Sequence, residues 1–438
     1  MTDALDVKWY SPLSFGYLKS YLAKALGREI DFISVTEQEL LTQPFDLIAL
    51  SATSQDFGRC QEWVNRFREM NRDSPIVLGG HHITYLPGTL PEGVQVGVIG
   101  EGEETFAEII RILFRAEGSL CSSDLRHIPG IVYRENGEVI CHPRRPNIEN
   151  LDLLPHPDRD GHGTTYLFSS RGCHYRCSFC TSSAFWGNIR YFSADYVVDE
   201  IEGILERFGE RISHLTFMDD LMTVNRPRLQ RMATLLAERG LNKRVTLSMA
   251  IRAGLVDDDL CRILKSMNVS DVFFGAESGV DRILKYLKGG IQTVAQNQET
   301  LDILAKYHIP VSLSLIIGVP GETESDLHET YGFILRNLND NKLWAASVNI
   351  LMPMPGTRIW EKALAMGVFN LQNIEWQRLS CFAYYKNSAI SDISDWIRTR
   401  KERHSYYLNE EGIPEERLLS LMEEYETKIE GIKKGKPA

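Results

Sequence analysis

The 438-residue sequence has no run of about 18 apolar residues, the length that a helix needs to cross a bilayer. Its first ten residues, MTDALDVKWY, contain neither a basic start nor an apolar core, so no signal peptide is expected. Acidic residues outnumber basic ones, and the formal net charge is -11. A negative protein repels nucleic acid and anionic membranes, so neither is expected as a partner.

Cysteine is scarce as well, with eight residues in a long chain, and most of them stand alone. Such scattered thiols do not form the dense framework of a disulfide-stabilised secreted protein. They fit a reducing cytoplasm, where clustered thiols more often bind metal or take part in chemistry. The five single cysteines are Cys60, Cys121, Cys141, Cys261 and Cys381, which leaves three that lie together.

The N-terminal part of the chain alternates apolar strands with amphipathic helices. Residues 45–51 and 75–80 are predicted to be buried parallel strands, while 15–26 and 58–70 have helical spacing. Residues 94–106 predict a strand, a glycine turn and the start of a helix. This pattern is typical of an open, doubly wound α/β domain, whose ligands bind beyond the carboxyl ends of the strands.

Six units of strand followed by helix begin at about residue 165. The signal for further strands is missing, so an incomplete (β/α)6 TIM barrel is predicted, with its chemistry on the loops at the carboxyl ends of the strands. The predicted strands are TYLFSSRG, HLTFMDD, VTLSMAIR, DVFFGAESG, PVSLSLIIG and AASVNILMP.

The fold class is therefore α/β, with a Rossmann-like sheet followed by the partial barrel and a small C-terminal cap. The linker is expected to contain a β-hairpin that turns at Asn136 and Gly137. The C-terminal region, with Trp376, Tyr384 and Tyr385, is expected to cap the barrel and select the substrate. The predicted boundaries are 1–125 for the Rossmann-like domain, 126–160 for the linker, 161–369 for the barrel and 370–438 for the cap.

Three cysteines lie close together after the first barrel strand, in the stretch RGCHYRCSFC. Their spacing is C-x3-C-x2-C, formed by Cys173, Cys177 and Cys180. A structural zinc site closes with four protein ligands, and an iron–sulfur cluster also prefers four thiolates. Three thiolates on a cluster would leave one iron open to an exchangeable ligand, which is the mark of a catalytic centre. A zinc knuckle or inert thiols are the alternatives.

This motif, with the aromatic Phe179 before its last cysteine, resembles that of the radical S-adenosylmethionine (SAM) superfamily. The resemblance implies that Cys173, Cys177 and Cys180 hold a [4Fe–4S] cluster whose open iron chelates SAM. It also implies that one electron from the cluster cleaves a carbon–sulfur bond and generates a carbon radical. An electron donor such as flavodoxin or ferredoxin would then be a partner.

The ends of the second and third strands carry charged residues that the resemblance assigns to SAM. Asp219 and Asp220 are expected to accept hydrogen bonds from its amino group, with helix capping as the alternative. Arg252 is expected to bind its carboxylate, with a surface ion pair as the alternative.

The last three strand ends also carry candidate cofactor contacts. Glu277 and Ser278, within a G-x-E-S-G sequence, are expected near the ribose or amino group of SAM. Ile316 and Gly318 resemble the family's adenine-contact segment, and Met354 is expected to flank the adenine. Each motif taken singly also has a simple structural interpretation as a turn or cap. Their order, one after each strand, favours the SAM site.

The N-terminal domain resembles the cobalamin-binding domain of one radical SAM group, which includes enzymes similar to the anaerobic magnesium-protoporphyrin cyclase and phosphinate P-methylases. Residues 78–87 and 97–106 carry this resemblance. The His-ligating form has D-x-H-x-x-G, whereas residues 11–16 keep only the glycine, so cobalamin would lack a protein imidazole ligand. The alternative is a degenerate domain without corrinoid. The strand-end residues expected near cobalamin are Ser51, Thr53, Gly79, Gly80, Gly100 and Glu101.

The expected reaction is cobalamin-assisted methyl transfer to an unactivated carbon or phosphorus centre of a small molecule. One alternative is transfer of a 3-amino-3-carboxypropyl group to a soft acceptor such as arsenic, with Cys381 assisting. Radical cyclisation, epimerisation or oxidation is another. Transfer RNA methylthiolation would call for a basic RNA-binding region, which the acidic chain lacks. A non-catalytic carrier would not need the strand-end motifs.

Overall fold

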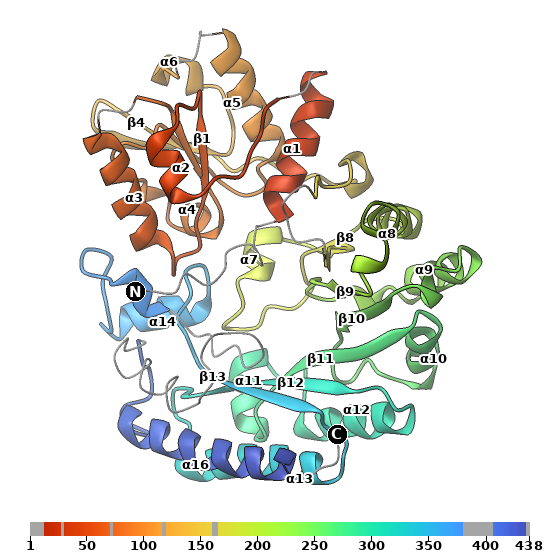
Figure 1. Ribbon diagram of the computed structural model, residues 1–438. Coiled ribbons are helices and arrows are strands. Elements are labelled where there is room, and N and C mark those ends of the chain that lie inside the picture. Colours follow the sequence, from red (N-terminus) through yellow and green to blue (C-terminus); the bar gives the residue numbers. More distant parts are fainter. Residues whose placement is uncertain are drawn as a thin grey trace. The chain divides into compact units, whose positions relative to one another are not determined.

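The computed structural model describes residues 13–27, 30–70, 73–115, 120–159, 165–379 and 406–434. The chain divides into two compact units. One unit comprises Met1–Gly163 together with the short segment Glu375–Gln377. The other comprises Thr164–Ile374 and Arg378–Ala438. Each unit has its own sheet (Figure 1), and each is described by itself below.

The N-terminal unit contains a five-stranded sheet in the order β1-β2-β3-β4-β5. The first three strands are parallel, and the last two continue the sheet as an antiparallel hairpin. The hairpin turns at Asn136 and Gly137, which both have positive φ, as the sequence predicted. The strands are β1 (Ile48–Ser51), β2 (Ile76–Gly79), β3 (Val96–Val98), β4 (Ile131–Glu135) and β5 (Glu138–Cys141).

Six helices accompany this sheet, and α1 packs against α5 next to the parallel strands. Buried side chains of β3 and α5, among them Val96, Phe106 and Ile109, form the core of this packing. Glu103 and Glu104 in the first turn of α5 and Arg115 in its last turn complement the helix dipole. The helices are α1 (Leu13–Leu26), α2 (Glu37–Thr42), α3 (Phe57–Glu69), α4 (His81–Tyr85), α5 (Glu103–Arg115) and α6 (Ser122–Leu125).

The second unit contains a six-stranded sheet in the order β13-β12-β11-β10-β9-β6, and every neighbouring pair is parallel. The α/β class and the six parallel strands predicted from the sequence are confirmed. The outer strands β6 and β13 do not pair with each other, so the sheet stays open. Its strands are β6 (Tyr166–Leu167), β9 (His214–Phe217), β10 (Thr246–Ala250), β11 (Val269–Glu277), β12 (Val311–Ile317) and β13 (Ala345–Ile350).

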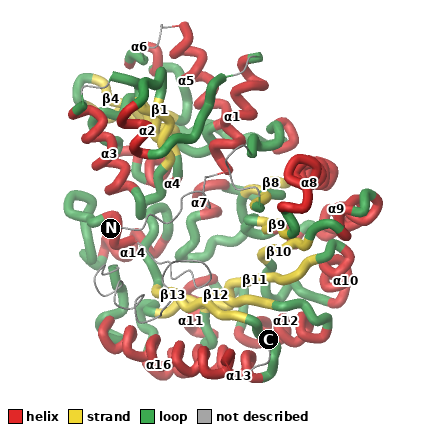
Figure 2. The backbone as a smooth tube through the Cα atoms, viewed as in Figure 1, coloured by secondary structure: helices red, strands yellow, loops and turns green. Residues whose placement is uncertain are grey.

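Helices follow the strands and lie along the outer side of this sheet, as Figures 1 and 2 show. Several begin at a capping side chain: Ser193 accepts a hydrogen bond from the third backbone N–H of α8, and Thr323 does the same for α13. Thr323 and Asp326 form a capping box at the start of α13. The helices are α7 (Ser182–Trp186), α8 (Ala194–Phe208), α9 (Arg226–Glu238), α10 (Asp258–Ser266), α11 (Asp281–Lys288), α12 (Val294–Lys306), α13 (Glu324–Asn339), α14 (Arg358–Ala365) and α16 (Glu415–Lys434).

Side chains alternate along the strands of the second unit. In β12 every second residue from Val311 to Ile317 is buried, and the residues between them are only half-buried. The buried set is apolar and forms the helix-facing core, whereas the other face carries Ser312, Ser314 and Ile316.

The first barrel strand is shorter than predicted. The sequence favoured one strand over 165–172, but β6 ends at Leu167. The chain then turns, and β7 (Ser170–Arg171) pairs with β8 (Arg190–Tyr191) in a separate two-stranded ribbon. The break occurs because the backbone N–H of Ser169 donates to the Asp219 carboxylate instead of to a neighbouring strand.

The region 126–160, which was predicted to be a linker, is part of the N-terminal sheet. Strand β4 pairs with β3, so the hairpin within 126–160 completes the N-terminal sheet.

None of the helices in the described ranges combines the length and the apolar character needed for a transmembrane span.

Candidate active site

The three clustered cysteines lie in the loop that follows β7. The loop starts at Gly172, which has a φ of 95° and whose α-carbon faces the backbone of Asn188. A side chain there would come within 2.9 Å of the Asn188 carbonyl oxygen, so only glycine fits this turn. Cys173, Cys177 and Cys180 are half-buried free thiols.

Two neighbouring elements fix the middle of this loop. The backbone N–H of Ser178 donates to the Leu287 carbonyl at the end of α11, at 2.7 Å. The Ser178 carbonyl accepts a hydrogen bond from the N–H of Ile359 in α14, at 3.2 Å. The Arg358 guanidinium donates to the Arg176 carbonyl at 2.5 Å. Because both sides of Ser178 are held, the cysteines on either side of it have a defined place.

The three thiols share one electrostatic environment. Burial raises the pKa of each thiol, and that of Cys180 rises to about 12. The charges of Asp220, Cys177 and Cys173 raise the pKa of Cys180 further. A cationic centre that binds such thiols favours their thiolate form. The donor set therefore fits a cluster of iron ions.

A cavity of about 550 Å³ adjoins two of these cysteines. Within the described ranges, no three His, Cys, Asp or Glu side chains are arranged around a single metal ion. A [4Fe–4S] cluster places its three thiolates on three different irons, which sets them further apart than ligands of one ion. The cavity is lined by Arg176, Cys177, Cys180, Ser183, Ala184, Gly356, Thr357 and Arg358.

Asp219, at the end of β9, is buried, and its carboxylate is occupied by the chain itself. It accepts hydrogen bonds from the N–H and the hydroxyl of Ser169, at 2.9–3.0 Å, and from the hydroxyl of Ser170. Arg228 closes the same corner by donating to the Ser169 carbonyl at 2.6 Å. These contacts favour a role for Asp219 in anchoring the start of the cysteine loop.

Asp220, the next residue, has a different environment. Its carboxylate accepts a hydrogen bond from the Ser182 hydroxyl in α7, two residues beyond Cys180. The residue keeps exposed surface, yet enough protein surrounds the carboxyl group to raise its pKa, with the Ser182 bond acting in the opposite direction. Of the two aspartates, Asp220 is the one with surface available to a ligand.

Arg252, just beyond β10, packs directly on the cysteine loop. Its guanidinium carbon lies 3.4 Å from the ring centroid of Tyr175, which sits between the first two cysteines. One guanidinium nitrogen donates to the Ile291 carbonyl at 3.0 Å. The residue is almost buried, so the alternative of a surface ion pair is wrong. A guanidinium fixed over the loop is suited to binding a carboxylate beside the cluster.

Glu277, the last residue of β11, is buried in a left-handed backbone conformation with a φ of 57°. Its Oε1 forms an ion pair with Nζ of Lys288 at 3.1 Å, and both side chains are 8% exposed. A side chain at Gly275 would come within 1.9 Å of that Oε1, so glycine is required for the Glu277 carboxylate to fold back along the strand. Ser278 is buried, with its hydroxyl against that of Thr330 at 3.2 Å.

The adenine-contact segment lies at the end of β12. Gly318 has a φ of 72°, and a side chain there would meet the Tyr407 ring at 2.8 Å. Its N–H donates to the carboxyl group of Glu322 at 2.6 Å. Burial raises the pKa of Glu322 to about 8, so this group is largely protonated at neutral pH. Glu322 therefore acts as a structural brace of the turn.

The two remaining barrel predictions lie on either side of this turn. Ile316 is half-buried on the inner face of β12. Met354 is half-buried in the turn after β13, where its carbonyl accepts a hydrogen bond from the Thr357 hydroxyl at 2.7 Å. Phe179 is half-buried within the cysteine loop. The described structure thus collects the predicted residues at the carboxyl ends of one sheet, while their contacts with SAM stay predictions.

Two residues that the sequence motifs did not indicate belong to this site. Tyr175 lies inside the cysteine motif and stacks on Arg252. Lys288 ends α11 and pairs with Glu277. The only sequence signal for Lys288 is its place before Gly289 and Gly290, which is also a common helix ending.

The cobalamin predictions lie at the carboxyl edge of the parallel strands in the N-terminal unit. Ser51, the last residue of β1, and Thr53 are exposed. Gly79, the last residue of β2, Gly80 and Gly100 are half-buried. The Thr53 hydroxyl donates to Asp56 at 2.6 Å. This edge has backbone surface open to a ligand. Glu101 differs, because it is buried and accepts a hydrogen bond from the Ile148 N–H at 2.7 Å.

His82 is a structural residue of the same edge. Its ring stacks on Phe57 at 3.5 Å and meets Trp376 edge-on at 4.6 Å. Both ring nitrogens are engaged, one with Ser54 at 3.0 Å and the other with Thr89 at 2.9 Å. The two hydrogen bonds give His82 a structural role in this unit. Trp376 was expected over the barrel, but its side chain packs in the N-terminal unit.

The His82 environment leads to a prediction about pH. Burial lowers the pKa of His82 to about 3, whereas the unfolded side chain has a pKa of about 6.5. Between these two pH values the unfolded chain binds a proton on His82 and the folded unit does not. The free energy of unfolding therefore falls as pH drops from 6.5 towards 3. Between pH 7 and pH 5 we expect His82 to account for a loss of about 2 kcal/mol in the free energy of unfolding.

Urea unfolding of the wild type and of His82→Gln at pH 5, 6 and 7 measures this effect. The variant cannot titrate, so its stability should change with pH by about 2 kcal/mol less than that of the wild type. Equal pH dependence of the two proteins would contradict the prediction.

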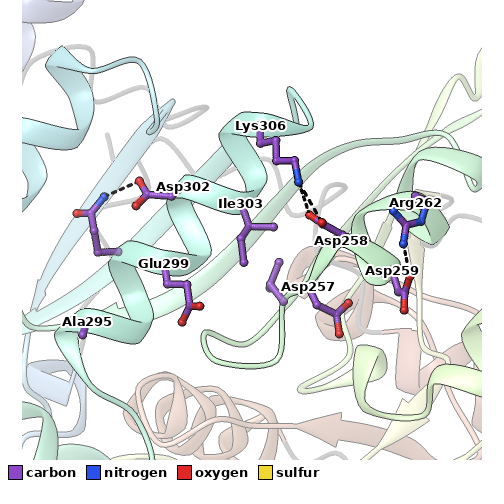
Figure 3. Close-up of a pocket in the computed structure, with 11 residues that line it drawn as sticks. Asp257, Asp258, Asp259, Arg262, Ala295, Glu299, Asp302, Ile303 and Lys306 are labelled. Carbon is purple, nitrogen blue, oxygen red and sulfur yellow. Dashed lines mark hydrogen bonds and ion pairs between the residues drawn. The ribbon is translucent and has the colours of Figure 1, made fainter.

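Another surface recess lies between α10 and α12 (Figure 3). Its carboxylates are partly paired: Lys306 contacts Asp258 at 2.9 Å, and Arg262 contacts Asp259. None of the predicted site residues lines it. Cys381, Tyr384 and Tyr385 fall outside the described residues.

Comparison with known proteins supports both halves of this arrangement. Residues 167–334 match the family model of the radical SAM superfamily, and residues 10–110 match that of the B12 binding domain. The chain therefore carries a radical SAM domain, and the protein is an enzyme. A B12 binding domain precedes the radical SAM domain in the same chain.

The chain has relatives among known sequences and among solved structures. An uncharacterized methyltransferase of Pyrococcus horikoshii is 28% identical over 84% of this chain and 81% of its own length. The anaerobic magnesium-protoporphyrin IX monomethyl ester cyclase of Cereibacter sphaeroides is 24% identical over 72% of this chain, which spans 53% of the cyclase. The radical SAM methyltransferase TsrM of Kitasatospora setae, solved with cobalamin and a [4Fe–4S] cluster, superimposes with a TM-score of 0.65. It is 18% identical, with coverage of 81% of this chain and 75% of TsrM.

The family assignment confirms a [4Fe–4S] cluster and SAM as cofactors and supports cobalamin as a third. These relatives confirm that the chain resembles cobalamin-dependent radical SAM methyltransferases as a group.

Proposed function

We propose that this enzyme transfers a methyl group from SAM, by way of cobalamin, to an unactivated carbon or phosphorus centre of a small molecule. The observation that carries the proposal is the presence of a three-cysteine loop at the barrel strand ends together with a B12 binding domain in one chain. When bound, the cluster supplies the electron that cleaves SAM, and cobalamin carries the methyl group. An external electron donor such as flavodoxin or ferredoxin belongs to the proposal, because the reductive step consumes an electron.

The chain's own residues are assigned roles in this proposal. Cys173, Cys177 and Cys180 hold the cluster. Arg252, fixed over the cysteine loop, binds the SAM carboxylate, and the exposed Asp220 accepts from its ammonium group. Glu277 directs its second carboxylate oxygen to the ribose or amino group.

The N-terminal unit has the corresponding part in cobalamin binding. Ser51, Thr53, Gly79 and Gly80 offer hydroxyl and backbone groups at the open strand edge. His82 cannot ligate cobalt without losing either its bond to Ser54 or its bond to Thr89. The proposal therefore places cobalamin in this unit without an imidazole from His82.

The fate of SAM tests this function. The chain would be reconstituted anaerobically with iron and sulfide, then given a reductant, SAM and cobalamin, and the nucleosides identified by mass spectrometry. We expect 5′-deoxyadenosine, together with S-adenosylhomocysteine that forms only when cobalamin is present. Methylthioadenosine as the cluster-dependent product would contradict methyl transfer and favour 3-amino-3-carboxypropyl transfer.

Radical cyclisation is the second candidate, because the cyclase of Cereibacter sphaeroides aligns with 72% of this chain. The same assay separates the two functions. Cyclisation consumes SAM as a source of the adenosyl radical alone, so 5′-deoxyadenosine would form without S-adenosylhomocysteine whether or not cobalamin is added.

A further inference from the structure

The end of α11 and the turn after it touch three separate parts of the candidate active site. The Leu287 carbonyl accepts from Ser178 of the cysteine loop at 2.7 Å. Nζ of Lys288 pairs with Oε1 of Glu277 at 3.1 Å. The Ile291 carbonyl accepts from Arg252, which stacks on the cysteine loop. Residues 287–292 therefore contact the cysteine loop, the third strand end and the fourth strand end.

This segment is held in one conformation by its own bonds. Gly289 and Gly290 both have left-handed backbone angles, with φ values of 71° and 83°, which let the chain reverse directly after the helix. Gln292, 2% exposed, donates to the Gly275 carbonyl at 2.9 Å and to Asn297 at 2.7 Å. The turn thus returns to the same strand that ends in Glu277.

Lys288 is saturated by acceptors inside this network. Besides Glu277, its ammonium group donates to the Gly275 carbonyl at 2.7 Å and to the Gln292 side chain at 3.1 Å. For the second carboxylate oxygen of Glu277, Oε2, the described residues provide no hydrogen bond. Lys288 therefore fixes one oxygen of Glu277 and leaves the other oxygen available.

We propose that residues 287–292 form a positioning element for the SAM site, in which Lys288 acts through Glu277. A buried ion pair adds little net stability compared with apolar packing of the same volume. The role of this pair is to position the Glu277 carboxylate, which belongs to a residue with an uncommon left-handed backbone conformation. This inference rests on the proposed function, since it takes Glu277 to be a SAM contact.

Removal of Lys288 should loosen Glu277 and weaken SAM binding. For Lys288→Met we expect the dissociation constant for SAM to rise about 10- to 100-fold, as when the outer partners of ligating groups are removed. We also expect the change that SAM causes in the electron paramagnetic resonance spectrum of the reduced cluster to be reduced or lost. The matched control is Lys285→Met, an exposed lysine one turn earlier on α11, which should match the wild type in both measurements.

A double-mutant cycle separates positioning from general damage. The full chain would be prepared as wild type, Glu277→Gln, Lys288→Met and the double variant, with iron content and the dissociation constant for SAM measured by equilibrium dialysis. If Lys288 acts through Glu277, the double variant binds SAM as Glu277→Gln does. If Lys288→Met alone fails to fold, the comparison of Glu277→Gln with the double variant still decides, because neither protein buries an unpaired carboxylate.

The outcomes distinguish this inference from the proposed function. A wild-type chain that binds neither a cluster nor SAM would contradict the proposed function. A wild type that binds both, with Lys288→Met within twofold of it, would overturn the positioning role alone. Effects of Glu277→Gln and Lys288→Met that multiply in the double variant would also overturn it, because the two residues would then act independently.

Discussion

Replacement of Cys177 by alanine is expected to abolish the iron–sulfur cluster and all cleavage of SAM. Cys177 is the central thiol of the motif and lies in a loop fixed on both sides of Ser178. With one thiolate removed, only two protein ligands remain for a cluster that already has one open iron. Anaerobically reconstituted Cys177→Ala should be colourless where the wild type is brown, and mass spectrometry should detect no nucleoside product.

The matched control for this result is Cys141→Ala. Cys141 is an exposed free thiol on β5, in the unit that does not contain the cysteine loop. The control should keep the colour, iron content and SAM cleavage of the wild type. A Cys177→Ala protein that retains wild-type iron content would mean that the three clustered cysteines are not the cluster ligands.

Replacement of Asp219 by alanine is expected to cause the second large effect, a loss of stability. The buried carboxylate accepts bonds from the Ser169 N–H and from the hydroxyls of Ser169 and Ser170. Burial raises the pKa of Asp219, and these bonds act in the opposite direction. Since alanine would leave a buried backbone N–H and two hydroxyls without their acceptor, we expect the free energy of unfolding to fall by about 3 kcal/mol. Urea unfolding of the apoprotein measures it.

Asp195→Ala is the control for this change. Asp195 is exposed in the first turn of α8 and pairs with Arg231 at 3.3 Å, a surface ion pair worth at most about 1 kcal/mol. The experiment also decides between the two interpretations of Asp219. If Asp219→Ala proves as stable as Asp195→Ala but loses SAM affinity, the aspartate is a ligand contact and its anchoring role is refuted.

Much of this fold follows from local sequence patterns. Strand and helix periods identified six parallel strands in the second unit and the parallel strands of the first, because apolar spacing within ten or so residues reflects which face is buried. The Asn136–Gly137 turn was likewise predicted correctly, since it depends on neighbours only a few residues away. The predicted length of the first barrel strand was wrong, because the hydrogen-bond ladder of that strand is broken by an aspartate 50 residues later.

In the candidate site, too, some features follow from local sequence and others depend on long-range contacts. The sequence by itself determined the chemistry: three thiols at C-x3-C-x2-C and one candidate cofactor-binding motif at the end of each later barrel strand. Only the tertiary structure decided which groups are engaged by the chain, because that depends on segments far apart in sequence. It bound Asp219 to Ser169, paired Glu277 with Lys288 and packed Trp376 against His82. Motif spacing fixes which atoms are present, whereas long-range packing fixes where each carboxylate and ring points.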